Sequence, residues 1–178
     1  MSRSVLWPAW CVAFGIAAST TPSLAQKVAA PAPAPAGAFT GPINIKDLKV
    51  QLFLEKSARL SENIADSGRN FQNAHRGESV AEPASGLFVT LEVTGPKNGQ
   101  SNDKIARHMA QVNVTRKYRT GPKLEQRVFG GFRFNDQGVA YKAFMVDAAT
   151  CAPIEIEARL GASRKTVKIE FDCTAENT

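Results

Sequence analysis

Histidine, cysteine and tryptophan are scarce in this sequence, and their scarcity weakens several functional readings. The chain has 2 His, 3 Cys and 2 Trp. A zinc centre needs several His and Cys ligands at close spacing. His75 lies in a polar loop and His108 lies beside Arg107, so we expect both on the solvated surface. Sugar-binding surfaces generally present aromatic rings, and both tryptophans, Trp7 and Trp10, lie close to the N-terminus. We therefore predict no metal and no cofactor.

Catalytic motifs are missing as well. The sequence contains no G-x-S-x-G nucleophile elbow and no Gly-rich phosphate loop that opens a helix. Its loop aspartates occur singly, at Asp66, Asp103, Asp136 and Asp147. Single aspartates do not signal a calcium site. We name no catalytic residue and expect a chain without enzymatic activity, with a small hydrolase whose site is assembled from loops as an open alternative.

Long apolar runs are also lacking. The N-terminal apolar stretch covers residues 9–18, which is shorter than the roughly 20 residues of a membrane span. Arg3 precedes this stretch and Ser23-Leu24-Ala25 follows it, the pattern of a secretory signal peptide. We predict a signal peptide over residues 1–25, cleavage near Ala25, no transmembrane segment in the mature chain, and a periplasmic or secreted location.

An Ala/Pro-rich stretch, residues 26–42, follows the predicted cleavage site. Proline removes backbone donors and favours extended chain, so such a stretch cannot build a core. We predict a semi-rigid linker over 26–42. The remaining residues, 43–178, are enough for a single domain with a sizeable core.

Alternation of apolar and polar residues, the period of a half-buried strand, occurs in residues 48–54, 87–93, 154–160 and 165–173. The last two segments predict a hairpin in which Leu160 faces Lys165 and Ile154 faces Phe171. Further strands are predicted within 105–118, 127–134 and 139–146. We expect the last two of these to form a second hairpin around the turn at 135–138.

Two segments are harder to assign. Residues 57–65 fit either a helical turn or a short strand, and residues 66–86 are predicted as a long polar loop. Seven or eight strands separated by turn signals, with no long helical period, predict an all-β fold. We expect an antiparallel β-sandwich of the immunoglobulin-like or C2-like type, with at most one short helix.

Cysteine usage predicts one disulfide. Cys11 leaves with the signal peptide, so the mature chain keeps Cys151 and Cys173, and two cysteines in an exported chain most simply pair with each other. Cys173 has the parity of the core face, whereas Cys151 has that of the solvent face. We therefore expect Ala152 and Pro153 to break the regular pleat, since proline is found at strand starts rather than in central ladders.

Basic residues gather in one part of the chain. Residues 104–127 carry a net charge of +6, and the whole chain also carries +6. The basic residues in this segment are Lys104, Arg107, Arg116, Lys117, Arg119, Lys123 and Arg127, and its one acidic residue is Glu125. A solvated strand end that discourages edge-to-edge aggregation would have this composition. A surface that attracts anions would have it too.

These observations favour an exported, non-enzymatic binding or accessory module. On this hypothesis the seven basic residues contact an anionic envelope polymer, a lipid headgroup or an acidic partner protein. Nucleic acid is disfavoured for two reasons: the chain is expected to be exported, and only Tyr118 is interleaved with the cations for base stacking. A purely structural subunit of an envelope complex stays open beside the hydrolase, and the sequence predicts no oligomeric state.

Overall fold

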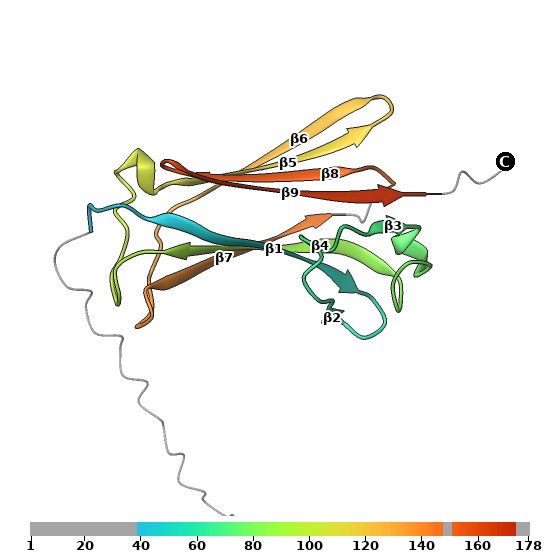
Figure 1. Cartoon of the computed structure of the whole chain (residues 1–178), viewed down its shortest axis with the longest axis horizontal. Helices are drawn as coiled ribbons and strands as arrows, with labels where there is room; N and C mark the ends of the chain where they lie inside the picture. The colour runs from blue at the N-terminus through green and yellow to red at the C-terminus, as the bar shows by residue number, and fades with distance from the viewer. Residues whose placement is uncertain (1–38, 148–150, 174–178) are drawn as a thin grey trace, which may run out of the picture. The chain divides into compact units, whose positions relative to one another are not determined.

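A computed structural model describes residues 39–147 and 151–173, all within one compact unit, Ala34–Thr178. The predicted signal peptide and most of the predicted linker lie outside the described residues. The described part is all-β, as predicted, and its strands form two sheets that face each other (Figure 1). No helix among the described residues is long and apolar enough to cross a membrane.

The strands are assigned by residue as β1 (Asn44–Leu54), β2 (Arg59–Leu60), β3 (Asn70–Gln72), β4 (Ala84–Thr94), β5 (Ala110–Tyr118), β6 (Gly121–Phe129), β7 (Val139–Asp147), β8 (Ile154–Leu160) and β9 (Ser163–Asp172). Two short 3-10 helices are η1 (Ala74–Arg76) and η2 (Ala106–His108). One sheet has the strand order β2-β1-β4-β7 and the other β3-β9-β8-β5-β6. The described strand pairs are antiparallel except β3 with β9.

The core forms between the inner faces of the two sheets. Leu48, Val50 and Leu52 of β1 are almost fully buried, and the apolar residues of β4, β8 and β9 at the same parity are buried as well. Their polar neighbours point outward. Burying one face of each strand stabilises the sandwich, since each fully buried aliphatic side chain contributes about 1.5–3 kcal/mol. The alternation predicted for these four strands is confirmed.

The hairpin β8–β9 has a different register from the predicted one. Leu160 pairs with Ser163 and Ile154 with Ile169, so the predicted pairing of Leu160 with Lys165 is wrong. The loop contains only Gly161 and Ala162, and Gly161 adopts the left-handed conformation that the tight turn needs, with φ of 57°. A shift of two residues keeps every side chain on its face, so the hydrophobic pattern could not distinguish the two registers.

The second predicted hairpin is also wrong. The sixth strand covers Gly121–Phe129 instead of 127–134, and β7 pairs with β4 in the other sheet. The turn at 135–138 is local: the Asn135 side chain accepts hydrogen bonds from the N–H groups of Gln137 and Val139. Between β6 and this turn, the Gly131 N–H donates to Asp103. The chain crosses there from the five-stranded sheet to the four-stranded sheet.

The polar segment 66–86 contains more structure than the predicted loop. Its strand β3 pairs in parallel with the end of β9. Phe71 of β3 is 1% exposed and its ring lies 5.6 Å from that of Phe171. The packing of Phe71 on Phe171 thus anchors the mostly polar segment 66–86 to the five-stranded sheet.

His108 is buried rather than solvated, which corrects the sequence prediction. Its Nδ1 accepts a hydrogen bond from the Asn102 N–H at 3.1 Å, and its Nε2 lies 2.8 Å from the carbonyl oxygen of Gly41. The ring is fully buried and stacks on Phe39. The end of the segment predicted as linker therefore contacts the sandwich, because it supplies both the ring and the carbonyl that surround His108.

Candidate ligand-binding cleft

Three strand ends meet at one end of the five-stranded sheet. The antiparallel register brings Arg116, near the end of β5, beside Ile154 at the start of β8, and Ile154 beside Ile169 on β9. A cleft of about 640 Å³ opens there. It is lined by Asn70, Lys117, Tyr118, Arg119, Thr120, Cys151, Pro153, Glu170, Phe171, Asp172 and Cys173. The topology thus assembles the cleft from segments that are far apart in the sequence.

A disulfide between Cys151 and Cys173 forms part of the cleft wall, which confirms the predicted pairing. The two Cα atoms lie 4.9 Å apart. Cys151 precedes the first residue of β8 and lies outside the ladder, as the parity argument required. The Lys117 N–H donates to the Pro153 carbonyl at 2.9 Å, so this irregular segment is attached to β5 as well as to β9.

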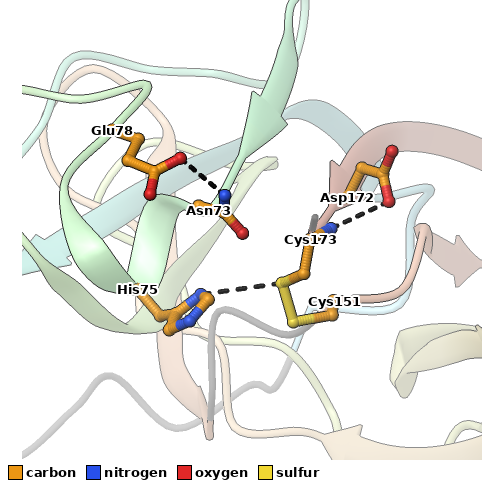
Figure 2. The surroundings of a disulfide bond; sticks show 6 residues. All are labelled: Asn73, His75, Glu78, Cys151, Asp172 and Cys173. Carbon is orange, nitrogen blue, oxygen red and sulfur yellow. Dashed lines mark hydrogen bonds between the residues drawn. A yellow bond between two sulfur atoms is a disulfide. The ribbon is translucent and has the colours of Figure 1, made fainter. Parts of the chain in front are cut away.

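His75 lies beside the disulfide, with Nδ1 3.6 Å from the Sγ of Cys173 (Figure 2). The Asn73 N–H donates to the Asp172 carbonyl at 2.8 Å and holds this segment against the end of β9. The ligand atoms of His75, Cys151 and Cys173 all lie within 4.8 Å of one another. Because the two sulfur atoms are bonded to each other, neither is the thiolate that metal binding requires. With Cys151 and Cys173 oxidised, the disulfide is a covalent cross-link in the cleft wall.

The structure brings together four of the seven predicted basic residues. Lys117 and Arg119 line the cleft. Arg116 directly precedes Lys117 and is paired with Lys123 on β6. The two lie on the face of the hairpin that also carries the buried Val112 and Val114. Arg116 is only 5% exposed, so it is a structural cation more than a surface one.

The other three lie elsewhere. Lys104 and Arg107 precede β5 and so lie at its opposite end, where the Arg107 guanidinium donates to the Thr40 carbonyl. Arg127 pairs with Val112 near the start of β5, toward the open end of the hairpin. The seven residues therefore do not gather in one place, and the cleft can use only those at the hairpin end.

Carboxylates neutralise part of the hairpin charge. Glu125 forms ion pairs with Arg127 at 2.6 Å and with Arg116 at 3.7 Å, and Glu155 pairs with Lys117 at 3.0 Å. The part of the chain that the structure describes places no carboxylate within 4.0 Å of the Arg119 guanidinium. Of the two cations that line the cleft, Lys117 is paired with a carboxylate, and Arg119 is the one whose charge no described carboxylate neutralises. The sequence did not identify Glu155 as a partner, since that contact depends on the β5–β8 register.

The cleft combines three kinds of chemistry. Lys117 and Arg119 supply cations, Glu170 and Asp172 supply carboxylates, and Tyr118, which is 37% exposed, supplies a ring. A guanidinium recognises carboxylate or phosphate groups, a carboxylate accepts hydrogen bonds from hydroxyl groups, and an aromatic ring offers an apolar face. A ligand that carries both acidic and hydroxyl groups would use all three.

No model of a known protein family matches this chain, and no curated protein matches it. Its function must be inferred from the cleft itself.

Proposed function

We propose that this chain is an exported, non-enzymatic binding module that holds an acidic polysaccharide of the cell envelope in the cleft at the β5–β6 hairpin. The observation that carries this proposal is the position of Arg119. Arg119 lines the cleft together with Lys117, and no carboxylate lies within ion-pair distance of it among the described residues. The acidic group of a sugar would fill that place.

The rest of the cleft supports a sugar over the other anionic ligands considered from the sequence. Glu170 and Asp172 would repel an acidic protein segment that offers them no hydroxyl groups, but they suit the hydroxyl groups that an acidic sugar carries beside its carboxylate. Tyr118 offers the ring face that sugars commonly pack against. A lipid headgroup and an acidic partner protein are the alternatives that the experiment below distinguishes.

The same proposal gives roles to the predicted signal peptide, residues 1–25, and to the predicted linker, residues 26–42. The signal peptide exports the protein to the periplasm or beyond, and the Ala/Pro-rich linker works as a tether between the N-terminus and the sandwich. We also assign the two-sheet domain to the immunoglobulin-like or C2-like type. Domains of this architecture carry loops at the sheet ends, and loops commonly carry binding residues.

The experiment compares equilibrium binding of polygalacturonate to the wild type and to two doubly substituted variants at low salt. Lys117→Gln with Arg119→Gln should weaken binding at least about tenfold, since two charge-assisted contacts are lost. Lys104→Gln with Arg107→Gln removes the same charge at the far end of β5 and should bind like the wild type. Arg116 is left unchanged because it is buried.

Three results would contradict the proposal. Equal losses in both variants would mean that only net charge matters, and absence of binding to any acidic glycan would exclude the ligand class. Preferential binding to anionic lipid vesicles would reassign the cleft to headgroups. Dextran, which has hydroxyl groups but no charge, is the control ligand, and release of shorter sugars during incubation would instead favour the hydrolase alternative.

A further inference from the structure

The strand β6 is an exposed edge. It is the last strand of the five-stranded sheet, and no described strand pairs with its outer side (Figure 1). Leu124 is 62% exposed and Val128 is 57% exposed. A long edge strand with exposed apolar side chains is a template for pairing with another strand.

The direction of the unpaired backbone groups follows from one hydrogen bond. The Lys117 N–H donates to Pro153 next to β8, so it points away from Pro122, its partner on β6. Hydrogen-bonded and non-hydrogen-bonded pairs alternate along an antiparallel ladder. The backbone groups of Leu124, Gln126 and Val128 therefore point away from β5, toward the free edge.

We propose that two copies of this chain associate by pairing their β6 strands antiparallel about a two-fold axis at Gln126. In this register Gln126 faces its own copy and Leu124 faces Val128, so the three residues with outward backbone groups form the hydrogen-bonded pairs. On the other face, Glu125 of each copy lies opposite Arg127 of the other. The strand is thus complementary to itself in its backbone, apolar and charged groups.

The neighbouring registers lack this complementarity. An axis at Glu125 would set the two Glu125 side chains against each other and Lys123 against Arg127. An axis at Arg127 would set the two Arg127 side chains against each other. Like charges directly opposite in a sheet are destabilising, so charge disfavours both of these registers. An axis at Leu124 would set Lys123 against Glu125, but it would pair Gln126 with Pro122, which has no N–H to donate. The resulting interface is small, and small interfaces are weak and transient, so the dimer should depend on protein concentration.

Cysteine cross-linking tests the register. In a hydrogen-bonded pair the opposed Cα atoms are about 5.5 Å apart, which suits a disulfide. Gln126→Cys should therefore link to its own copy under mild oxidation. The matched control is Asn113→Cys, which sits opposite position 126 one strand inward and so lies about 10 Å farther from its copy. A mixture of Leu124→Cys and Val128→Cys proteins should cross-link more than either alone.

Equal cross-linking of the Asn113→Cys and Gln126→Cys proteins would overturn the proposal, because it would reflect random collision. Efficient linking of Leu124→Cys to itself would also overturn it, because that requires another register.

Sedimentation across a concentration series gives an independent test. Gln126→Pro removes the outward N–H but no hydrogen bond to β5, and prolines are tolerated on edge strands. Relative to Gln126→Ala, which loses the same contact with Asn113, it should weaken dimerisation roughly 10- to 100-fold. Circular dichroism of both variants checks that the sandwich is retained. A wild type that stays monomeric at every concentration, or a proline variant that dimerises like the alanine variant, would contradict self-pairing.

Discussion

At the residue scale, the contacts of His108 show how one side chain joins the start of the domain to its core. Both ring nitrogens are engaged, one by the Asn102 N–H and the other by the Gly41 carbonyl. An amide donor and a carbonyl acceptor that lose their partner inside a protein each cost about 1–3 kcal/mol. The sequence did not indicate this role, because His108 directly follows Arg107, and Phe39 and Gly41, which contact the ring, are far away along the chain.

We expect His108→Phe to lower the free energy of unfolding by about 2–4 kcal/mol, since the phenyl ring fills the space but leaves two polar groups unpaired. His75→Phe is the control, because His75 is exposed and surface substitutions usually change stability by less than about 0.5 kcal/mol. Urea unfolding followed by circular dichroism measures both. Equal effects of the two substitutions would show that the ring hydrogen bonds of His108 do not stabilise the fold.

A second residue-scale prediction concerns acid stability. The Lys165 ammonium lies 2.6 Å from the Oδ1 of Asp47 and forms an ion pair between the two sheets. That hydrogen bond lowers the pKa of the Asp47 carboxyl, and burial opposes it in part. A carboxyl with a lower pKa in the folded state stabilises the fold above its unfolded pKa of about 4 and loses this contribution as the pH falls through the folded value.

Lys165→Met should therefore reduce stability at pH 6, by less than about 1 kcal/mol because the pair is partly exposed. The difference from the wild type should shrink below about pH 4, where Asp47 is protonated in the unfolded chain. Lys168→Met, on the outer face of the same strand, should show no such pH dependence. A Lys165 effect that is unchanged between pH 6 and pH 2 would have to come from packing instead of the ion pair.

At the scale of the element, the disulfide closes the base of the β8–β9 hairpin. Cys151 and Cys173 are separated by 22 positions in the sequence, and the chain-entropy estimate for such a loop is about 3 kcal/mol. Substituting both cysteines by Ala should lower the melting temperature by about 10 °C while the sandwich still folds. Calorimetry of the variant and of the reduced wild type measures the loss, and melting temperatures equal to that of the oxidised protein would rule out the stabilising role.

A strand can be predicted from this sequence only where one of its two faces is buried. The strands β1, β4, β8 and β9 alternate between core and solvent, so their period was visible. In β6 both faces are largely solvated and Leu124 and Val128 are exposed, so the period was lost. In β3 a single buried residue, Phe71, is too little for a pattern.

The cleft was predictable only in part, for a related reason. The sequence located the basic segment and the disulfide, and the structure places Lys117, Arg119 and the two cysteines in one cleft wall. The sequence could not place Lys104 and Arg107 at the far end of the strand, because the charge of a segment does not show where each of its residues lies in the fold. Ion pairs across strands depend on register, which the hydrophobic pattern left open by two residues.

At the scale of the whole molecule, the two proposals reinforce each other. Antiparallel pairing of two β6 strands would direct the two hairpin ends, and so the two clefts, in opposite directions along the joined sheet. A polymer that reaches both clefts would bind with avidity, since the second contact becomes intramolecular. Either proposal can fail alone: a monomer could still bind an acidic glycan, and a dimer could form without binding one.

The salt dependence of glycan binding measures the role of the cleft cations most directly. Polygalacturonate affinity of the wild type should fall steeply as sodium chloride rises from about 20 mM to about 200 mM, because salt screens exposed charges. In a plot of log affinity against log salt, Lys117→Gln with Arg119→Gln should reduce the slope by roughly one to two, as expected for two lost ionic contacts. Lys104→Gln with Arg107→Gln should leave the slope unchanged. A flat salt response of the wild type, or equal slopes in all three proteins, would contradict an anion-binding cleft at the β5–β6 hairpin.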